Sequence, residues 1–421
     1  MDYGKTLTQS LLSNGADKRE NKMAFNPSVF KQHFPYLQQA DAVVYLDSAA
    51  TALKPQVLTD ATIAFYQSAG SVHRSQYDEK QTALFEQARE NVKNFIGAES
   101  EETIIWTSGT THAINCVARG LSHQLHPKAE IIISEADHHA NFVTWSEIAR
   151  QYGATLHILP INEQWLIEEQ DLIAVLNTNT VLVALNMVSN VTGTEQPVAN
   201  LIKLIRQHSH ALVLVDAAQA ISHLPIDLQR LDADFIAFSA HKLYGPNGLG
   251  VLSGKRHALE QLHPLLYGGK MVERVSAQHI RFAELPYRLE AGTPNIAGVI
   301  GFNAVLEWLS QWDLTAAEQH AIALAEQCKM RLKNYPHCQL FLSPQPSSIV
   351  CFVFNGIATS DIATLLAEQN IALRAGEHCA QPYLARLGQH STLRLSFAPY
   401  NQQADVDAFF SALDNALALL D

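Results

Sequence analysis

Four stretches of the sequence decide the fold: IIISEADHHAN (131–141), VLVALNMVSNVTG (181–193), ALVLVDAAQ (211–219) and FIAFSAHK (235–242). Each is a run of apolar residues that ends in small polar ones, and TIIWTSGTT (103–111) has the same form. Apolar runs without alternation are typical of strands buried on both faces of a parallel sheet. They predict an α/β protein with a large, doubly wound, mostly parallel sheet.

The segments between these strands support the same architecture. Stretches 142–152 and 196–208 have helical patterns and are long enough for right-handed crossovers between parallel strands. Ligands of such sheets bind beyond the carboxyl ends of the strands. Because each of these strand ends carries polar side chains, we expect the functional site there.

The pattern changes after about residue 300, where a long helical stretch (314–334) precedes the strand patterns QLFLS and SSIVCFVF. These features predict a smaller α+β domain and a ligand cleft between the two domains. The predicted division is a flexible extension over 1–23, an arm over 24–45 that joins the small domain, a large domain over 46–300 and a small domain over 301–421.

Composition excludes several classes of protein. The chain has 421 residues, of which 47% are apolar and 17% charged, and its net charge is −12. That charge argues against nucleic-acid binding, and no apolar run reaches the roughly 18 residues of a membrane span. Five scattered cysteines form neither a CxxC pair nor a disulfide framework. Without a secretory signal pattern, the sequence predicts a reduced, soluble, cytoplasmic protein.

Two strand ends suggest how an anionic, nitrogen-containing ligand is held. Ser108–Thr111 lie between a strand and a helix, where backbone N–H groups and hydroxyls suit a phosphate, although an ordinary helix N-cap turn has the same pattern. Asp216 ends an apolar run, where a carboxylate needs a partner. It is interpreted either as a helix cap or as the partner of a protonated ring nitrogen.

Lys242 and His138 add reactive and flat groups at the same edge. A lysine just past a buried strand can lose its proton and act as a nucleophile, although most lysines are surface residues. His138 and His139 form no metal motif with the other histidines, so we expect no metal and interpret His138 as a ring that stacks on a flat ligand. Together the four features describe a site for pyridoxal 5′-phosphate.

The sequence resembles the cysteine desulfurases of the class V aminotransferase-like, fold type I pyridoxal phosphate enzymes, and most of all the branch of cysteine sulfinate desulfinase and the Suf-type desulfurases. The segments that carry the resemblance are DSAATALKP (47–55), HRSQYD (73–78), SGTT (108–111), EADHHAN (135–141), SNVTG (189–193), DAAQ (216–219), SAHKLYGPNGLGVL (239–252), LEAGTPN (289–295), RAGEHCAQP (374–382) and TLRLSFAPYN (392–401). The resemblance runs from about residue 24 to the C-terminus.

The resemblance implies cofactor-binding roles. Lys242 would bind the cofactor covalently, Asp216 would pair with its ring nitrogen and Gln219 would reach its ring hydroxyl. His138 would stack on the ring. The residues implied to hold the phosphate are Thr110, Thr111, Ser239, His241 and, from the second subunit of a homodimer, Thr293.

It also implies residues that act on the substrate. Arg394 and Asn190 would hold the substrate carboxylate, and His73 and Arg74 resemble active-site residues near the dimer contact. Cys379 would accept the sulfur. In the loop of Cys379, the positive charges of Arg374 and His378 would favour a thiolate, whereas the negative charge of Glu377 opposes it.

One position departs from the family pattern. After SGTT the family usually has an acidic residue, whereas this chain has His112. The sequence alone offers no account of that exchange.

The expected activity is that of a homodimeric, pyridoxal phosphate-dependent sulfurtransferase of sulfur metabolism and iron–sulfur cluster assembly. It would convert L-cysteine to L-alanine and leave the sulfur on Cys379 as a persulfide, with cysteine sulfinate and selenocysteine as further substrates and a SufE-like protein as acceptor. The alternatives are a selenocysteine lyase or another class V aminotransferase, and a pyridoxal phosphate-binding protein without turnover.

Overall fold

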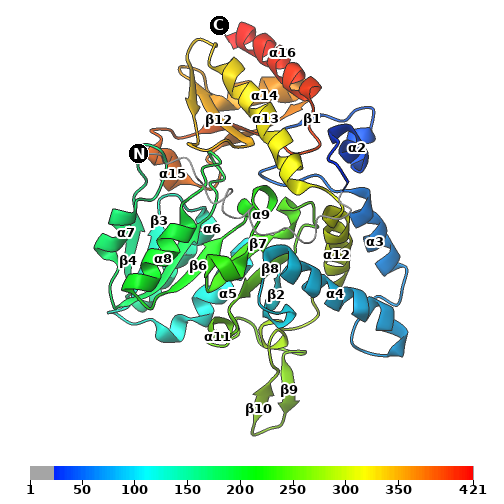
Figure 1. Cartoon of the computed structure of the whole chain (residues 1–421), viewed down its shortest axis with the longest axis vertical. Coiled ribbons are helices and arrows are strands. Elements are labelled where there is room, and N and C mark those ends of the chain that lie inside the picture. Colours follow the sequence, from blue (N-terminus) through cyan, green and yellow to red (C-terminus); the bar gives the residue numbers. More distant parts are fainter. Residues whose placement is uncertain (1–22, 421) are drawn as a thin grey trace.

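The computed structural model describes residues 23–420, so most of the predicted extension lies outside the described residues. The strands of its main sheet are β2 (Ile104–Thr107), β3 (Glu130–Ser134), β4 (Thr155–Leu159), β5 (Thr180–Asn186), β6 (Leu212–Asp216), β7 (Phe235–Ser239) and β8 (Gly250–Gly254). The seven strands have the order β2-β8-β7-β6-β5-β3-β4 (Figure 1). Strands β3 to β7 are parallel, and β8 runs antiparallel to both of its neighbours. The predicted mostly parallel α/β sheet is confirmed.

Helices cover both faces of this sheet, as its apolar strands require. Helices α5 (Thr110–Gly120) and α6 (His139–Tyr152) pack on one face, and α8 (Val198–His208) and α12 (Ile296–Ser310) on the other. Successive residues of one strand alternate between the two cores: Ile131 and Ile133 face α6, whereas Ile132 faces the opposite core. The two predicted crossovers are α6, between β3 and β4, and α8, between β5 and β6.

Further helices complete the layers around this sheet. Helices α3 (Gln56–Tyr66) and α4 (Glu79–Ile96) pack against α12. The remaining ones are short: α2 (Pro27–Gln32), α7 (Glu169–Val175), α9 (Ala220–His223), α10 (Leu228–Leu231) and α11 (Arg256–Leu259).

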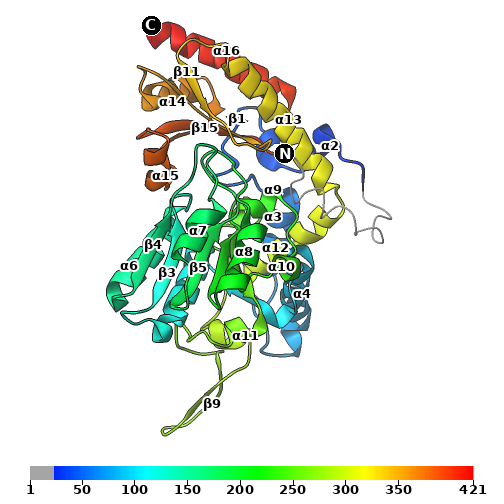
Figure 2. The same ribbon diagram turned by 60° about the vertical axis from the view of Figure 1, so that its left-hand side comes forward.

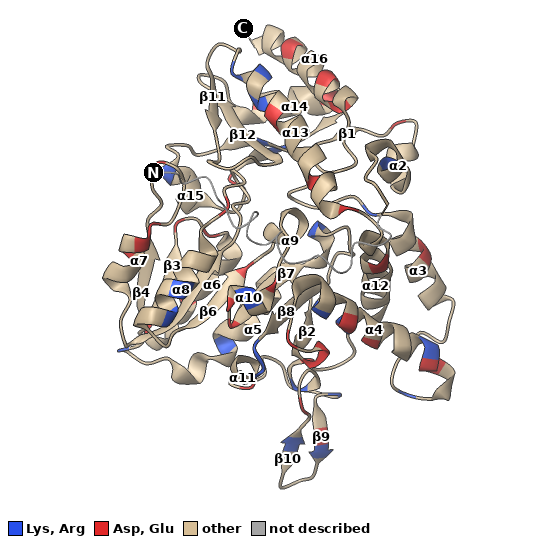
Figure 3. Cartoon of the chain, viewed as in Figure 1, with Lys and Arg blue, Asp and Glu red and all other residues tan. Residues whose placement is uncertain are grey.

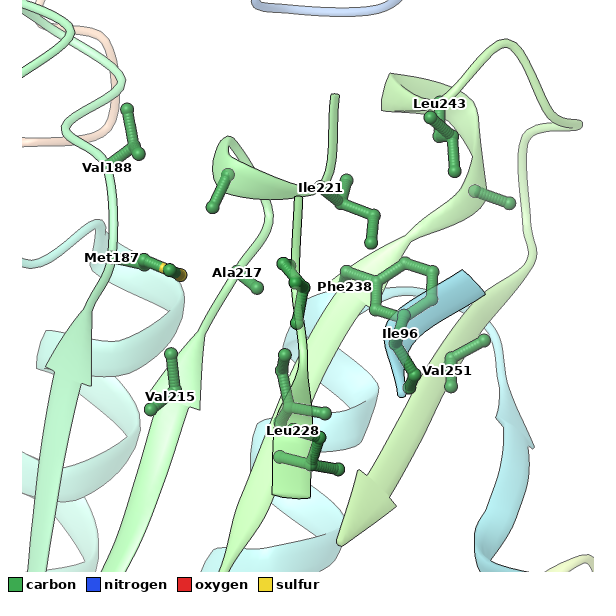
Figure 4. Packing of buried hydrophobic residues seen from close by; sticks show 14 of the residues in the cluster. Ile96, Met187, Val188, Val215, Ala217, Ile221, Leu228, Phe238, Leu243 and Val251 are labelled. Carbon is green, nitrogen blue, oxygen red and sulfur yellow. The ribbon is translucent and has the colours of Figure 1, made fainter. Parts of the chain in front are cut away.

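Apolar packing fixes the strand ends that carry polar residues. Val215, Phe238 and Val251, from three neighbouring strands, lie close to Ile221 of α9 in the same cluster, and all four are at most 2% exposed (Figure 4). Burial of such a side chain contributes about 1.5–3 kcal/mol. The strand ends therefore present the residues that follow them from a rigid support.

A second, antiparallel sheet has the order β11-β12-β15-β14. Its strands are β11 (Cys338–Phe341), β12 (Ile349–Phe354), β14 (Arg374–Gly376) and β15 (Thr392–Ser396), and the helices beside it are α13 (Leu314–Leu332), α14 (Thr359–Glu368), α15 (Gln381–Arg386) and α16 (Gln403–Leu420). Apart from α15, whose buried Tyr383 and Leu384 join the main core, these elements share a core of their own, and they lie at one end of the main sheet (Figures 1 and 2). The predicted domain boundaries stay predictions.

The N-terminal arm contacts this second unit through a short strand. Strand β1 (Val44–Tyr45) pairs in parallel with β13 (Ile371–Ala372). The stretch IALRAG (371–376) is divided between β13 and β14, because its two halves pair with different partners.

A hairpin of β9 (Val272–Val275) and β10 (Ile280–Phe282) extends away from the main sheet (Figures 1 and 2). Its strands carry Glu273, Arg274 and Arg281, and elsewhere too charges of both signs are spread over the elements (Figure 3). Within residues 23–420, no helix is both long and apolar enough for a membrane crossing.

Candidate active site

A cavity of about 220 Å³ lies where β5, β6 and β7 end, and residues from the second sheet close it. Most of the predicted site residues line this cavity: Thr110, Thr111, His138, Asn190, Asp216, Gln219, Ser239, His241, Lys242, Cys379 and Arg394. They come from segments far apart in the sequence. The structure thus brings together the residues that the strand ends and the resemblance singled out separately.

Lys242 ends a short 3₁₀ turn that follows β7. Among the described residues its ammonium group has no hydrogen-bond or ion-pair partner within the usual distances, although Asp216 and Arg394 are both near enough to affect its charge. Burial lowers the pKa of Lys242 to about 8, and the attraction of Asp216 only partly offsets this. At pH 7 about a tenth of this amine is therefore deprotonated and nucleophilic, far more than of an exposed lysine.

Asp216 is the last residue of β6 and is 5% exposed. One of its oxygens accepts a hydrogen bond from the backbone N–H of Ala218 at 2.9 Å, and burial raises the pKa of the carboxyl group. Nearby, Gln219 donates to the carbonyl of Ala49 at 2.7 Å, while its buried amide oxygen has no partner within the described part of the chain. These two side chains leave acceptors directed at a polar ligand.

Hydroxyl groups meet at the start of α5. The Ser239 hydroxyl accepts the backbone N–H of Thr110 at 2.8 Å and lies 2.7 Å from the Thr110 hydroxyl. A helix N-terminus with hydroxyls and free N–H groups favours an anion such as phosphate. His241 lines the same end of the cavity, and burial lowers its pKa to about 4, so it is neutral.

His138 caps α6 and is a neutral ring. Its Nδ1 accepts the backbone N–H of Ala140 at 3.0 Å, and burial lowers its pKa to about 4. The preceding Asp137 is fully buried, and its carboxylate accepts the backbone N–H groups of Ser134 at 2.8 Å and Asn186 at 3.1 Å. This side chain joins the ends of β3 and β5 and so fixes the position of His138.

Cys379 is exposed in a loop whose backbone is tightly held. Its carbonyl accepts the N–H of His139 at 2.7 Å, and Asn190 donates to the carbonyl of His378 at 2.7 Å. His378 and Cys379 have φ values of 52° and 53°, in the left-handed region that non-glycine residues rarely adopt. Such strain is typical of functional loops.

The prediction that a charged His378 supports a thiolate is wrong. His378 is buried and lies 2.9 Å from the Thr392 hydroxyl, and burial beside Arg394 and Arg374 lowers its pKa to about 3. The ring is therefore neutral. The positive charges around Cys379 come from the two arginines, which line the same cavity.

Arg394 reaches the cavity from β15. Its guanidinium donates to the carbonyl of Asn190 at 2.7 Å and to the Asp47 carboxylate at 2.8 Å. Its Nε is buried without a partner among the described residues. The arginine is thus held in place by two of its five N–H donors, which leaves the others free for a ligand.

His112 has an evident local role that the sequence did not show. Its Nδ1 accepts the backbone N–H of Ser108 at 3.1 Å, and burial lowers its pKa. A carboxylate at this position would accept the same hydrogen bond. The histidine therefore replaces the acidic residue of the family as an uncharged acceptor.

Three predicted site residues do not line the cavity of the single chain. His73 pairs with Glu86 at 2.9 Å, and Arg74 and Thr293 are exposed. Conversely, Asn186 lines the cavity although it was not predicted. Its position at the end of VLVALN follows the same pattern as Asp216 and is the signal that would have found it.

These groups fit pyridoxal 5′-phosphate. A lysine without a partner, a buried carboxylate with an available oxygen and a helix N-terminus lined by hydroxyls are the functional groups that its aldehyde, its ring nitrogen and its phosphate require. Arg394 lines the same cavity and keeps N–H donors for a substrate carboxylate.

Known proteins match nearly the whole chain. The family model of aminotransferase class V matches residues 44–409. A probable cysteine desulfurase of Haemophilus influenzae is 68% identical over 99% of this chain and 96% of the relative. The cysteine desulfurase CsdA of Escherichia coli is 50% identical over 94% of this chain and 99% of the relative.

A solved structure agrees with these matches. The crystal structure of CsdA (S-sulfonic acid) from Escherichia coli has a TM-score of 0.89 and 49% identity, and the match covers 94% of this chain and 99% of that one. On the extent of these matches, the chain belongs to the class V aminotransferase family and, within it, to the cysteine desulfurases.

Proposed function

We propose that this chain is a pyridoxal 5′-phosphate-dependent cysteine desulfurase in which Lys242 moves the substrate protons and Cys379 accepts the sulfur. The observation that carries the proposal is that an exposed thiol and a lysine without a partner line one cavity. Asp216, Gln219 and His138 would hold the cofactor ring. Thr110, Thr111, Ser239 and His241 would hold its phosphate.

The chain's own residues account for the steps on the substrate. Lys242 Nζ, deprotonated because of its lowered pKa, takes the proton from the substrate Cα. The bound cofactor supplies an electron sink for the charge left on that carbon. The Cys379 thiolate then attacks the substrate sulfur, and the Cβ–S bond breaks with its electron pair staying on Cβ. Cβ takes up a proton and Lys242 returns the proton to Cα, which leaves L-alanine and a persulfide on Cys379.

Arg394 and Asn190 would position the substrate. The N–H donors of Arg394 that Asn190 and Asp47 do not take are available to a carboxylate, and the Asp47 carboxylate orients the guanidinium. Asn190 acts in part through the Cys379 loop, because its amide holds the carbonyl of His378.

The direct test measures both products. With L-cysteine, we expect alanine to form in step with sulfur bound to the peptide that contains Cys379, as seen by mass spectrometry. An aminotransferase would instead form pyridoxamine phosphate, and a lyase specific for selenocysteine would leave cysteine unchanged. A protein that binds the cofactor without forming alanine would contradict the proposal.

The chain would act as a homodimer. Thr293, His73 and Arg74 lie outside the cavity of the single chain, as expected if a second copy brings them to it. Leu266 and Tyr267, before the hairpin, and Val275 and Ile280 within it are more than half exposed, which also supports a contact with another chain. Sedimentation velocity tests this, because a monomer at micromolar concentration would contradict it.

A SufE-like protein would collect the sulfur. The backbone on both sides of Cys379 is held by hydrogen bonds, so a persulfide cannot travel far, and an acceptor must bring its own thiol to the loop. All five cysteines are free thiols, which suits the reducing cytoplasm where we place the enzyme. We expect slow turnover alone and faster turnover with a SufE-like protein, whereas turnover that no such protein raises would contradict this role.

A further inference from the structure

Lys54 has an unusual set of partners. It lies just before α3, and its ammonium group donates to the carbonyls of Ala52 at 2.7 Å and His241 at 3.1 Å and to the Thr51 hydroxyl at 3.3 Å. No carboxylate of the described residues lies within 4 Å of it, whereas Lys93, Lys255 and Lys329 each pair with an acidic side chain. Burial lowers the pKa of Lys54 to about 8.

The contacts of Lys54 join two parts of the site. The carbonyl of His241 belongs to the turn that carries Lys242, and it also accepts the Thr51 hydroxyl at 3.3 Å. The backbone N–H of Ala52 donates to the same carbonyl at 3.0 Å. Lys54 therefore fastens the turn before Lys242 to the chain segment that precedes α3.

The phosphate end of the site has few positively charged side chains. A hollow opens there beside the main cavity and is lined by Thr51, Ser108, Gly109, Thr110, Thr111, His112, Ser239, His241, Asn247 and Gly248. None of these residues is a lysine or arginine, and both histidines have lowered pKa values. Lys54 stands behind two of them, Thr51 and His241, and its ammonium group donates a hydrogen bond to each.

We propose that Lys54 is a positioning residue of the cofactor site that holds the His241–Lys242 turn through the His241 carbonyl and balances the charge of a bound phosphate. An ammonium group that contacts only uncharged acceptors is costly in a partly buried place. A dianionic phosphate at the start of α5 offsets that cost, because the two charges attract through a medium of low dielectric constant. The inference rests on the proposed function, since it assumes that the phosphate of pyridoxal 5′-phosphate binds there.

The test compares ligands with and without the phosphate group. Cofactor-free wild type and Lys54→Met are titrated with pyridoxal 5′-phosphate and with pyridoxal, and bound ligand is measured by equilibrium dialysis. The loss of one partly screened charge should weaken pyridoxal 5′-phosphate about tenfold and pyridoxal less than about threefold. Lys255→Met is the control, because that lysine pairs with Asp232 on the surface and should leave both affinities unchanged.

A second variant keeps the test decisive if Lys54→Met does not fold. Lys54→Gln retains a donor for the turn without the charge, and it should show the same selective loss for the phosphate-bearing ligand. Equal weakening of both ligands, or no weakening of either, would overturn the inference and leave Lys54 as a structural residue. Failure of wild type to bind pyridoxal 5′-phosphate would instead contradict the proposed function itself, and the inference with it.

Discussion

The surroundings of Lys242 determine the pKa of its ammonium group. In the cofactor-free protein, burial disfavours the charged form and lowers its pKa from the usual 10.5 to about 8. The folded state thus gives up a proton that the unfolded chain keeps between these two values. The cost to stability is complete below pH 8 and disappears as the pH rises through 10.5.

We therefore predict a pH-dependent stability difference between wild type and Lys242→Met, both without cofactor. The free energy of unfolding of wild type should rise relative to the variant by about 2 kcal/mol between pH 8 and 10.5, a value reduced for partial exposure of the side chain. Urea denaturation at several pH values measures it. A constant difference across this range would show that the ammonium group is well solvated.

His112 gives a second prediction for a single residue. Its Nδ1 accepts the Ser108 N–H in the turn that precedes α5, as a helix-capping side chain does. His112→Ala should lower the free energy of unfolding by about 1 kcal/mol, whereas His112→Glu should retain most of it, because a carboxylate can accept the same bond. If thermal denaturation showed both variants equally destabilised, the hydrogen bond would not be the reason for the residue.

At the level of residues, the sequence could predict that side chains such as Asp216 and Lys242 lie together at the site. It could not predict the protonation state of each side chain. Asp216 and Lys242 follow apolar strands, so their place at the sheet edge could be predicted. The neutral state of His378 could not, because it depends on burial against Thr392 and on two arginines that are close only in the fold.

Strand β8 shows how one element limits another. Gly250 begins this strand, and a Cβ there would lie 2.5 Å from Gly109 Cα in the turn before α5. The strand and the turn therefore approach as closely as they do only because residue 250 is glycine.

We predict that Gly250→Ala displaces this turn. The variant should lose about 1–3 kcal/mol of stability and bind pyridoxal 5′-phosphate more weakly. Gly269→Ala is a matched control, because its Cβ would meet nothing within 4 Å. Thermal denaturation and a cofactor titration measure both effects, and a Gly250→Ala variant indistinguishable from the control would contradict the close approach.

At the level of elements, the pattern of apolar run and polar end found the central parallel strands and missed two others. Strand β4 is an edge strand with only one strand neighbour, and its sequence TLHIL mixes polar and apolar residues. Strand β8 is antiparallel, so it meets the site with its first residue, a glycine, and not with a polar group at its end. Neither strand is therefore an apolar run that ends in polar residues.

Over the whole molecule, Arg394 connects the two sheets. It lies on β15 and contacts Asn190, after β5 of the main sheet. A guanidinium binds a carboxylate at two points, which an ammonium cannot do. Arg394→Lys should therefore raise the cysteine concentration for half-maximal turnover about tenfold or more, with the bound cofactor unchanged. Loss of cofactor with unchanged cysteine affinity would place Arg394 in the phosphate site instead.

Cysteine and cysteine sulfinate have different leaving groups, so their reactions separate the role of Cys379 from that of Lys242. Sulfur must be taken from cysteine by a nucleophile, so Cys379 takes part in breaking the bond. The sulfinate group leaves as a stable sulfur oxyacid and needs no thiol. Lys242 is required for both substrates, because both begin with removal of the same Cα proton.

The most direct test of this account is alanine formation by Cys379→Ser and Lys242→Ala on both substrates, after cofactor content has been checked. Cys379→Ser should lose nearly all activity on cysteine and keep a substantial part on cysteine sulfinate, whereas Lys242→Ala should lose both. Equal losses on the two substrates in a fully loaded Cys379→Ser protein, or retained activity on cysteine, would contradict the assignment of Cys379 as the sulfur acceptor.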